Sequence, residues 1–227
     1  MFVKRLHRLI TASFLMFFLY GGSIDISLGN AFNINQDLNI QRDGKEDINL
    51  NASFKTNGLR SPQYYSLRFS KEISGKNFEF EFIHHKLYLD KISANNGSSE
   101  TVDLIEKFEV TDGYNLLMIN LKNSVHNNIG YRIGLGTVVS HPDIIIEGET
   151  NYVQGGGLIP KFWTDGYSWS GISSQFSIFL NKELSDKIHY NIEGKAVMAK
   201  TKIPIVDGSF DLPNISFHIL LGISFSI

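Results

Sequence analysis

The chain has 227 residues, with 21 basic and 23 acidic residues, a formal net charge of −2 and no cysteine. This balance argues against a nucleic-acid-binding protein, which usually carries a basic excess, and the lack of cysteine excludes a disulfide scaffold and thiolate metal sites. Seventeen phenylalanines, nine tyrosines and twenty glycines beside only five prolines suit an all-β chain.

The N-terminus has the layout of a secretory signal peptide. Three basic residues within the first eight positions precede an apolar block over residues 9–20, which is short for a transmembrane anchor, the competing interpretation. Small residues suitable for cleavage follow, so the expected signal peptide spans 1–31, with cleavage nearer Gly22 as an alternative. Residues 32–47 are polar and are expected to form a leader before the folded domain.

Alternation of polar and apolar residues predicts eight strands in the remaining domain, 48–227. The fourth strand changes phase, because Phe108 and Val110 suggest one face and Leu117 and Ile119 the other, and a bulge near Asp112 would reconcile them. The expected strands cover 48–55, 64–71, 78–89, part of 105–121, 129–140, a segment ending at 180, a segment from 188, and 214–227.

The last strand has one continuous apolar face. Its residues of odd number from 215 to 227 are all apolar, and those between them are mostly small or polar. A face of this length is long for a soluble strand and close to what crosses a bilayer as a tilted strand. It is predicted to close a barrel by pairing with the first strand, 48–55.

The links between the strands alternate in length. Those after the second, fourth and sixth strands are short, and those after the third, fifth and seventh are longer, an asymmetry typical of bacterial outer-membrane barrels. The predicted fold is therefore an all-β, eight-stranded antiparallel up-and-down transmembrane β-barrel. We expect a monomer that is exported through the periplasm to the bacterial outer membrane.

The stretch Phe217–Phe225 carries a family resemblance. It is similar to the C-terminal signal that the barrel-assembly machinery reads, although that signal usually ends on an aromatic residue and this chain ends at Ile227. The whole pattern resembles small bacterial outer-membrane β-barrels, the OmpA/OmpX class and the lipid A-modifying barrels. The resemblance implies outer-membrane lipids, lipopolysaccharide and the assembly machinery as partners, and no nucleic acid.

Both signs of charge are expected inside the barrel. Buried charges must be paired or hydrated, so a salt-bridge network that plugs the lumen is the leading interpretation and a narrow conduit the alternative. The residues predicted to face inward are Arg68, Glu79, Glu81, His85, Arg132, Glu193, Lys195 and His218.

Two sets of residues could be catalytic. Ser216 and His218 share a face and could meet Glu193 as nucleophile, base and orienting carboxylate, a trio that the resemblance to barrel-type lipid A deacylases also implies. Ordinary lumenal hydrogen bonding is the alternative for these residues.

The second set is His85, His141 and Asp143, expected near the outer rim. It could form a metal site or an acid/base pair near lipid head groups, or simply be polar residues at the membrane interface. Trp163 and Trp169, beside a triple glycine, predict an interfacial aromatic belt or a surface-binding loop.

Three functions follow from this pattern. The leading one is a structural or interaction barrel with exposed outer loops. The others are a lipid A- or phospholipid-modifying esterase or acyltransferase, and a narrow channel. Enzymatic activity is not the favoured interpretation, and no cofactor or metal is assigned because no nucleotide, flavin or haem motif occurs.

Overall fold

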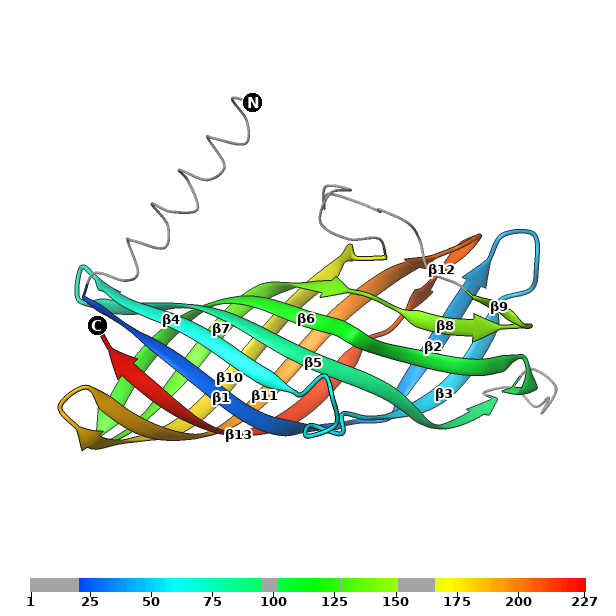
Figure 1. The fold of residues 1–227 in the computed structure, drawn as a ribbon. Helices are drawn as coiled ribbons and strands as arrows, with labels where there is room; N and C mark the ends of the chain where they lie inside the picture. Colours follow the sequence, from blue (N-terminus) through cyan, green and yellow to red (C-terminus); the bar gives the residue numbers. More distant parts are fainter. Residues whose placement is uncertain (1–20, 95–101, 127, 151–165) are drawn as a thin grey trace, which may run out of the picture.

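The computed structural model describes residues 21–94, 102–126, 128–150 and 166–227. These residues form one antiparallel sheet of thirteen strands that curves into an elongated barrel (Figure 1). No helix in the described residues is long and apolar enough to cross a membrane. The strands are β1 Gly22–Asn33, β2 Gln36–Arg42, β3 Ile48–Lys55, β4 Tyr65–Ile73, β5 Lys76–Ala94, β6 Ile105–His126, β7 Ile129–Ser140, β8 Asp143–Ile146, β9 Glu149–Thr150, β10 Ser168–Ser185, β11 Ile188–Ile205, β12 Gly208–Asp211 and β13 Asn214–Ser226.

Hydrogen bonding closes into a ring. The pairing runs from β1 through β4, β5, β6, β7, β10, β11 and β13, and β13 pairs back with β1 along eleven residue pairs. The expected all-β antiparallel architecture is therefore confirmed.

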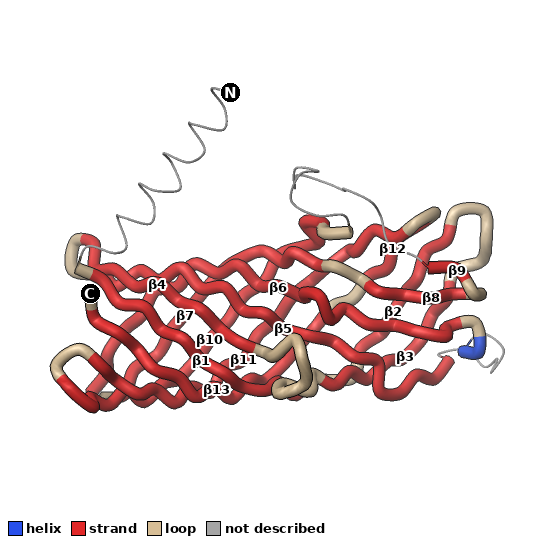
Figure 2. The backbone as a smooth tube through the Cα atoms, viewed as in Figure 1, coloured by secondary structure: helices blue, strands red, loops and turns tan. Residues whose placement is uncertain are grey.

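The structure has more strand segments than predicted, because β1, β2, β8, β9 and β12 lie where a signal peptide, a leader or loops were expected. β1 and β2 pair in succession with β13 and β12, and β7 and β8 pair in succession with β6. Each such couple follows one course along the barrel and is split by a bend. β3 and β4 are separated by a longer loop, residues 56–64, which we call the excursion. It lies on the side of the barrel, about halfway along its length (Figure 2).

The first strand lies earlier in the chain than predicted. β1 occupies residues 22–33, where a cleaved segment was expected, and the expected leader contains β2. The closing strand β13 consequently pairs with β1 and β11, whereas 48–55 pairs with β2 and β5. The small residues of β1 resemble a cleavage region and masked its alternation. Cleavage at 31 would remove most of β1, whereas cleavage near Gly22 would leave it whole. The apolar block at 9–20 lies outside the described residues.

Short links gather at one end of the barrel. The links between β4 and β5, β6 and β7, and β10 and β11 are two residues each and lie at the end where β1 starts and β13 finishes (Figure 1). The hairpins β2–β3, β8–β9 and β11–β12, with links of five, two and two residues, lie at the opposite end (Figure 1). The three two-residue links agree with the prediction, whereas the predicted long links include residues 95–101 and 151–165, which lie outside the described residues.

The wall reverses its polarity along the barrel axis. The terminal half of the barrel comprises β1, β4, β7, β10 and β13, with the adjoining parts of β5, β6 and β11. The hairpin half comprises β2, β3, β8, β9 and β12, with the remaining parts of β5, β6 and β11. In the terminal half, large apolar side chains are exposed on the outside and polar ones are buried inside. In the hairpin half, apolar side chains fill the inside and polar ones face out.

The strand β6 shows the reversal within one chain segment. Phe108 and Val110 are buried inside the hairpin half, whereas Ile119 and Leu121 are exposed outside the terminal half. A register shift does lie near Asp112, but it sets three residues of β6, 111–113, against one of β5, Lys86, so the two extra residues keep the alternation in phase. The same face of β6 therefore points inward along the whole strand. The apparent change of phase arises because the inside of the barrel is apolar in the hairpin half and polar in the terminal half.

Aromatic contacts hold the core of the hairpin half together. The ring of Phe108 packs at 5.9 Å from that of Phe54 and at 5.0 Å from that of Phe210. Because β3 alternates with Ile48, Leu50, Ala52 and Phe54 inward, its apolar face belongs to this core.

Candidate functional site

A buried ionic network fills the terminal half, centred on Arg68 of β4. Its guanidinium contacts four carboxylates: Glu81 at 2.7 Å, Glu193 at 2.8 Å, Asp25 at 3.2 Å and Glu79 at 3.6 Å. None of these side chains is more than 4% exposed. They meet because alternate residues of neighbouring strands point into the barrel at similar heights.

Two more cations share these carboxylates. Arg132 of β7 lies 2.7 Å from Glu79 and 3.4 Å from Glu193, and Lys195 of β11 lies 2.5 Å from Glu81 and 3.5 Å from Glu193. Three buried cations thus face four buried carboxylates, and neutral donors complete the shell.

Glu81 shows how burial of a carboxylate is offset. Besides its two cations, it accepts hydrogen bonds from Ser66 at 2.7 Å, Asn120 at 2.9 Å and Gln175 at 2.7 Å. A buried charge is tolerated when its lone pairs are filled in this way. All eight residues predicted to face inward do so and are buried.

A layer of two histidines lies beside this network. His218 of β13 and His85 of β5 are buried with ring centroids 4.9 Å apart. The hydroxyl of Tyr64 lies 2.5 Å from Nδ1 of His218, and that of Thr56 lies 3.1 Å from Nε2 of His85. Tyr64 and Thr56 are the two ends of the excursion between β3 and β4.

The predicted Ser216, His218 and Glu193 trio forms only in part. Ser216 Oγ lies 2.8 Å from His218 Nε2, a distance suited to a nucleophile and its base. The other imidazole nitrogen meets Tyr64, while Glu193 is held by Arg68 and other cations. Tyr64 was expected as the first residue of the strand 64–71, but nothing in the sequence indicated that it would meet His218; in the structure it precedes β4.

The second predicted set is not brought together. His85 is buried against His218, whereas His141 packs its ring 4.6 Å from that of Tyr167 and Asp143 pairs with Lys107 at 2.5 Å. Within the described residues, no group of three or more histidine, cysteine or carboxylate side chains is arranged to hold a metal ion. The triple glycine and Trp163 lie outside those residues.

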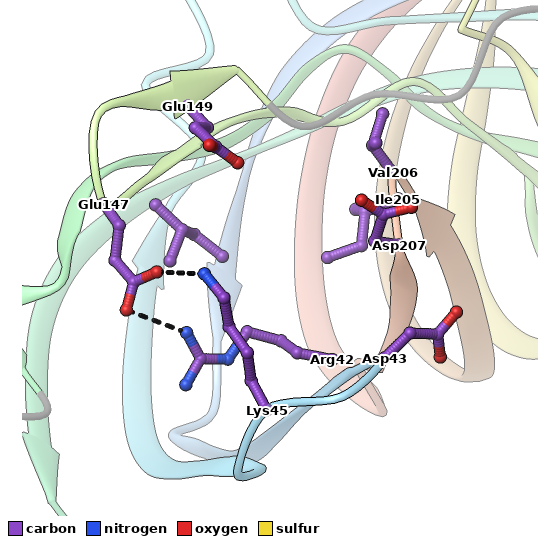
Figure 3. Close-up of a pocket in the computed structure, with 9 residues that line it drawn as sticks. Arg42, Asp43, Lys45, Glu147, Glu149, Ile205, Val206 and Asp207 are labelled. Carbon is purple, nitrogen blue, oxygen red and sulfur yellow. Dashed lines mark hydrogen bonds and ion pairs between the residues drawn. The ribbon is translucent and has the colours of Figure 1, made fainter.

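The hairpin tips meet at the far end of the barrel. Glu147 of the β8–β9 turn bridges to the β2–β3 hairpin through Arg42, at 3.2 Å, and Lys45 (Figure 3). A small hollow of about 80 Å³ lies between them and the β11–β12 tip, where the Asp43 amide donates to the Asp207 carbonyl at 2.8 Å. The hydrogen bonds from Lys45 and Arg42 hold the pKa of the Glu147 carboxyl below its usual value.

Comparison with solved structures finds likeness to bacterial outer-membrane β-barrels. The outer-membrane protein AlkL, solved in lipid bilayers, aligns over 91% of this chain and 90% of its own with 11% identity and a TM-score of 0.44. Ail, the attachment invasion locus protein of Yersinia pestis, aligns over 91% and 99% with 11% identity and a TM-score of 0.44. Neisserial surface protein A aligns over 91% and 97% with 8% identity and a TM-score of 0.41. No family model and no curated protein sequence matches the chain.

Proposed function

We propose that the protein is a bacterial outer-membrane β-barrel with a closed lumen, whose hairpin half stands outside the membrane and serves a structural or interaction role at the cell surface. The courses followed by the thirteen strand segments then amount to eight transmembrane strands. The observation that carries the proposal is the polarity reversal: the outside is apolar over the terminal half and polar over the hairpin half.

The apolar outer band has the height of an outer membrane. On the β1 course it runs from Ile24 to Ile34, interrupted by the exposed Asn30, and Asp37 and Asn39 follow outward on β2. About ten residue steps of ~3.3 Å, tilted by roughly 40°, rise about 25 Å, which matches the apolar band of such barrels.

The lumen is better suited to a plug than to a channel. Arg68 and the four carboxylates that it contacts are at most 4% exposed and joined by short ion pairs. A conduit would require water beside these groups. Planar-bilayer recordings test this: we expect no conductance steps from the wild-type protein, and regular steps would reject the plug.

A lipid-modifying esterase is the second candidate, favoured by the hydrogen bond between Ser216 and His218. Both side chains are at most 1% exposed, so a substrate would have to displace the excursion at 56–64. Mass spectra of lipid A from cells with and without the protein test this activity. A change that is lost in Ser216→Ala would support the enzyme, and identical spectra would reject it.

Single-cysteine labelling tests the leading proposal, because the chain has no cysteine of its own. An environment-sensitive fluorophore at Ile219→Cys should report hydrocarbon, and at Asn39→Cys it should report water. In intact cells, an impermeant maleimide should reach Asn39→Cys but not Ser74→Cys in the β4–β5 turn. Equal, water-like spectra at positions 219 and 39 would contradict membrane insertion.

Export and assembly are part of the same proposal. The mature protein should begin near Gly22, which N-terminal sequencing can check, because β1 must survive cleavage to pair with β13. Deleting residues from Phe225 onward should impair insertion if the assembly machinery reads this strand.

A further inference from the structure

The barrel wall is interrupted where β3 ends and β4 begins. On β1, pairing with β4 stops at Leu28 and one pair with β3 follows at Phe32. On β5, pairing with β4 stops at His84 and pairing with β3 begins at Tyr88. No strand lies between the two sides over this interval, so other groups must fill the wall there.

The excursion between the two strands fills this interval from outside. The Gly58 amide donates to Asn30 Oδ1 at 2.9 Å, and a Cβ on Gly58 would lie 2.1 Å from the Gly29 carbonyl oxygen. Only glycine allows so close an approach of two backbones. The amide of Tyr64 donates to the Gly58 carbonyl at 2.7 Å and closes the loop.

Two cationic side chains, those of Lys86 and Arg60, lie close together at this loop. Lys86 of β5 is fully buried, and its ammonium donates to the carbonyls of Asn57 at 3.1 Å and Arg60 at 2.5 Å. The Arg60 guanidinium lies 4.8 Å, and the Lys86 ammonium 5.4 Å, from the centre of the Tyr88 ring. Among the described residues, neither cation forms an ion pair, and the neighbouring Asp90 is paired with Lys55. Burying positive charge against neutral groups alone is costly, and an anion would relieve the cost.

A hollow opens on the outer face beside these cations. It has a volume of about 630 Å³ and is lined by Asn30 and by Asn57 to Arg60. Leu59 is 80% exposed at its edge, and Phe32 on β1 is 59% exposed. Large apolar side chains so exposed mark a binding or membrane surface.

The hollow spans the upper part of the apolar band: Asn30 lies within that band, between Leu28 and Phe32, whereas Arg60 lies over Tyr88, beyond Phe82 on β5. On β5 the outward series passes from Phe82 to His84 and Lys86, and on the β1 course it passes from Ile34 to Asp37. In the membrane orientation proposed above, the Arg60 side of the hollow lies toward the lipid head groups and the Asn30 side lies among the acyl chains. Phosphates therefore lie at the level of Arg60 and acyl chains at the level of Phe32.

We propose that this hollow binds a phosphate-bearing lipid of the leaflet nearest the hairpin half. The phosphate is held by Arg60, whose planar fork suits two phosphate oxygens, over the positive field of Lys86. An acyl chain follows Leu59 and Phe32 down the wall. The assignment rests on the proposed membrane orientation and adds to it a specific lipid site.

Native mass spectrometry of the refolded full chain tests this site. The protein is presented in detergent micelles with equal amounts of phosphatidylcholine and either lipid A or phosphatidylglycerol. Wild type should retain the anionic lipid in preference to phosphatidylcholine. Arg60→Gln should weaken that retention about tenfold or more, because a hydrogen bond to a charged group contributes about 1.5–3 kcal/mol. Preference for lipid A over phosphatidylglycerol would identify a phosphorylated glycolipid, and equal retention would indicate any anionic phospholipid.

The matched control is Lys200→Gln. Lys200 is the first outward cation above the apolar face of β11 and does not line this hollow. This variant should retain lipid as wild type does, and equal loss in both variants would overturn the site in favour of general surface charge. Leu59→Ser should lower retention of every lipid, because it removes an apolar contact with the acyl chain. A lipid ligand would be overturned if inorganic phosphate displaced the bound lipid while Leu59→Ser had no effect on retention. No anionic preference in a protein whose label at position 219 still reports hydrocarbon would reject the site alone, whereas a water-like label would reject the membrane orientation as well.

Discussion

Replacing Arg68 by methionine removes the centre of the lumenal network while keeping most of the side-chain volume. The guanidinium contacts all four carboxylates of the network, three of them through hydrogen bonds. In the variant, four buried carboxylates face only Arg132 and Lys195. Methionine adapts to irregular space, so lost packing contributes little to the effect.

The expected cost in the free energy of unfolding is about 3–5 kcal/mol, the range found when one partner of a buried ion pair is removed. The upper part of this range is favoured, since Arg68 neutralises several groups at once. This cost is mainly the penalty of leaving carboxylates buried without a cation, and it exceeds the net contribution of the native pairs.

The measurement is guanidinium-induced unfolding of protein refolded in lipid vesicles, followed by tryptophan fluorescence and by gel mobility with and without heating. Lys200→Met serves as the control, because it removes an exposed cation outside the network. Glu193→Gln combined with Arg68→Met should cost less than the sum of the single variants, with a coupling of about 1–3 kcal/mol.

A loss no larger than that of Lys200→Met would refute the reasoning. Strict additivity of the two network substitutions would also count against a shared ionic cluster. Both outcomes would indicate that water reaches the lumen and screens these charges, so the plug proposed above would fail with them.

Three further predictions address the outer surface and the hairpin half. Arginine at Ile219, on the apolar outer face, should cost about 2–4 kcal/mol, whereas arginine at Asn39, outward on β2, should change unfolding little; similar costs would contradict the polarity reversal. Phe108→Ala should cost about 3–5 kcal/mol in the same titration, because it empties the aromatic core, and a cost below about 1 kcal/mol would contradict close packing. Glu147 has a lowered pKa when folded, so its tip contact should be fully present above the usual carboxyl pKa and be lost as pH falls through the lowered value. Amide exchange at the tips should show this pH dependence in wild type, and Glu147→Gln should abolish it; unchanged dependence in that variant would assign it to another group.

The lumenal residues could be predicted from the sequence, because side chains two apart on a strand share a face. Arg68, Glu81 and Glu193 each alternate with apolar neighbours, so the inward side was clear without knowledge of the partners. The pairs themselves depend on register between strands distant in the chain. The contact of Arg68 with Glu193 spans 125 positions, and nothing local in either strand specifies it.

The polarity reversal and the first strand were not predicted. Alternation shows that a strand has two faces but does not show which face meets lipid, water or a core, so Ile48 to Lys55 fitted either arrangement. The segment 22–33 was concealed by its small residues, which satisfy the requirements of a cleavage region as well as those of a strand.

The site at the break in the barrel wall is formed by the loop 56–64, for which the alternation of polar and apolar residues gives no prediction. Thr56 and Tyr64 frame a loop, and their meeting with His85 and His218 results from the position at which β3 stops and β4 starts. The expected partnership of His85 with His141 is absent because the ring of His85 packs inside the barrel against His218, whereas that of His141, just after β7, packs against Tyr167.

The apolar core of the hairpin half makes this part of the barrel a rigid spacer. The seven residues of β2, at ~3.3 Å each and a tilt of roughly 40°, carry the tips about 18 Å beyond the apolar band. In the membrane orientation proposed above, a partner would meet the tips at a fixed height above the lipid. On a cell whose surface sugars are shorter than this height the tips are accessible, and on one with a thicker polysaccharide coat they are covered. The reach of the protein is thus set by the length of its strands, and the length of the surrounding sugars decides whether that reach is sufficient.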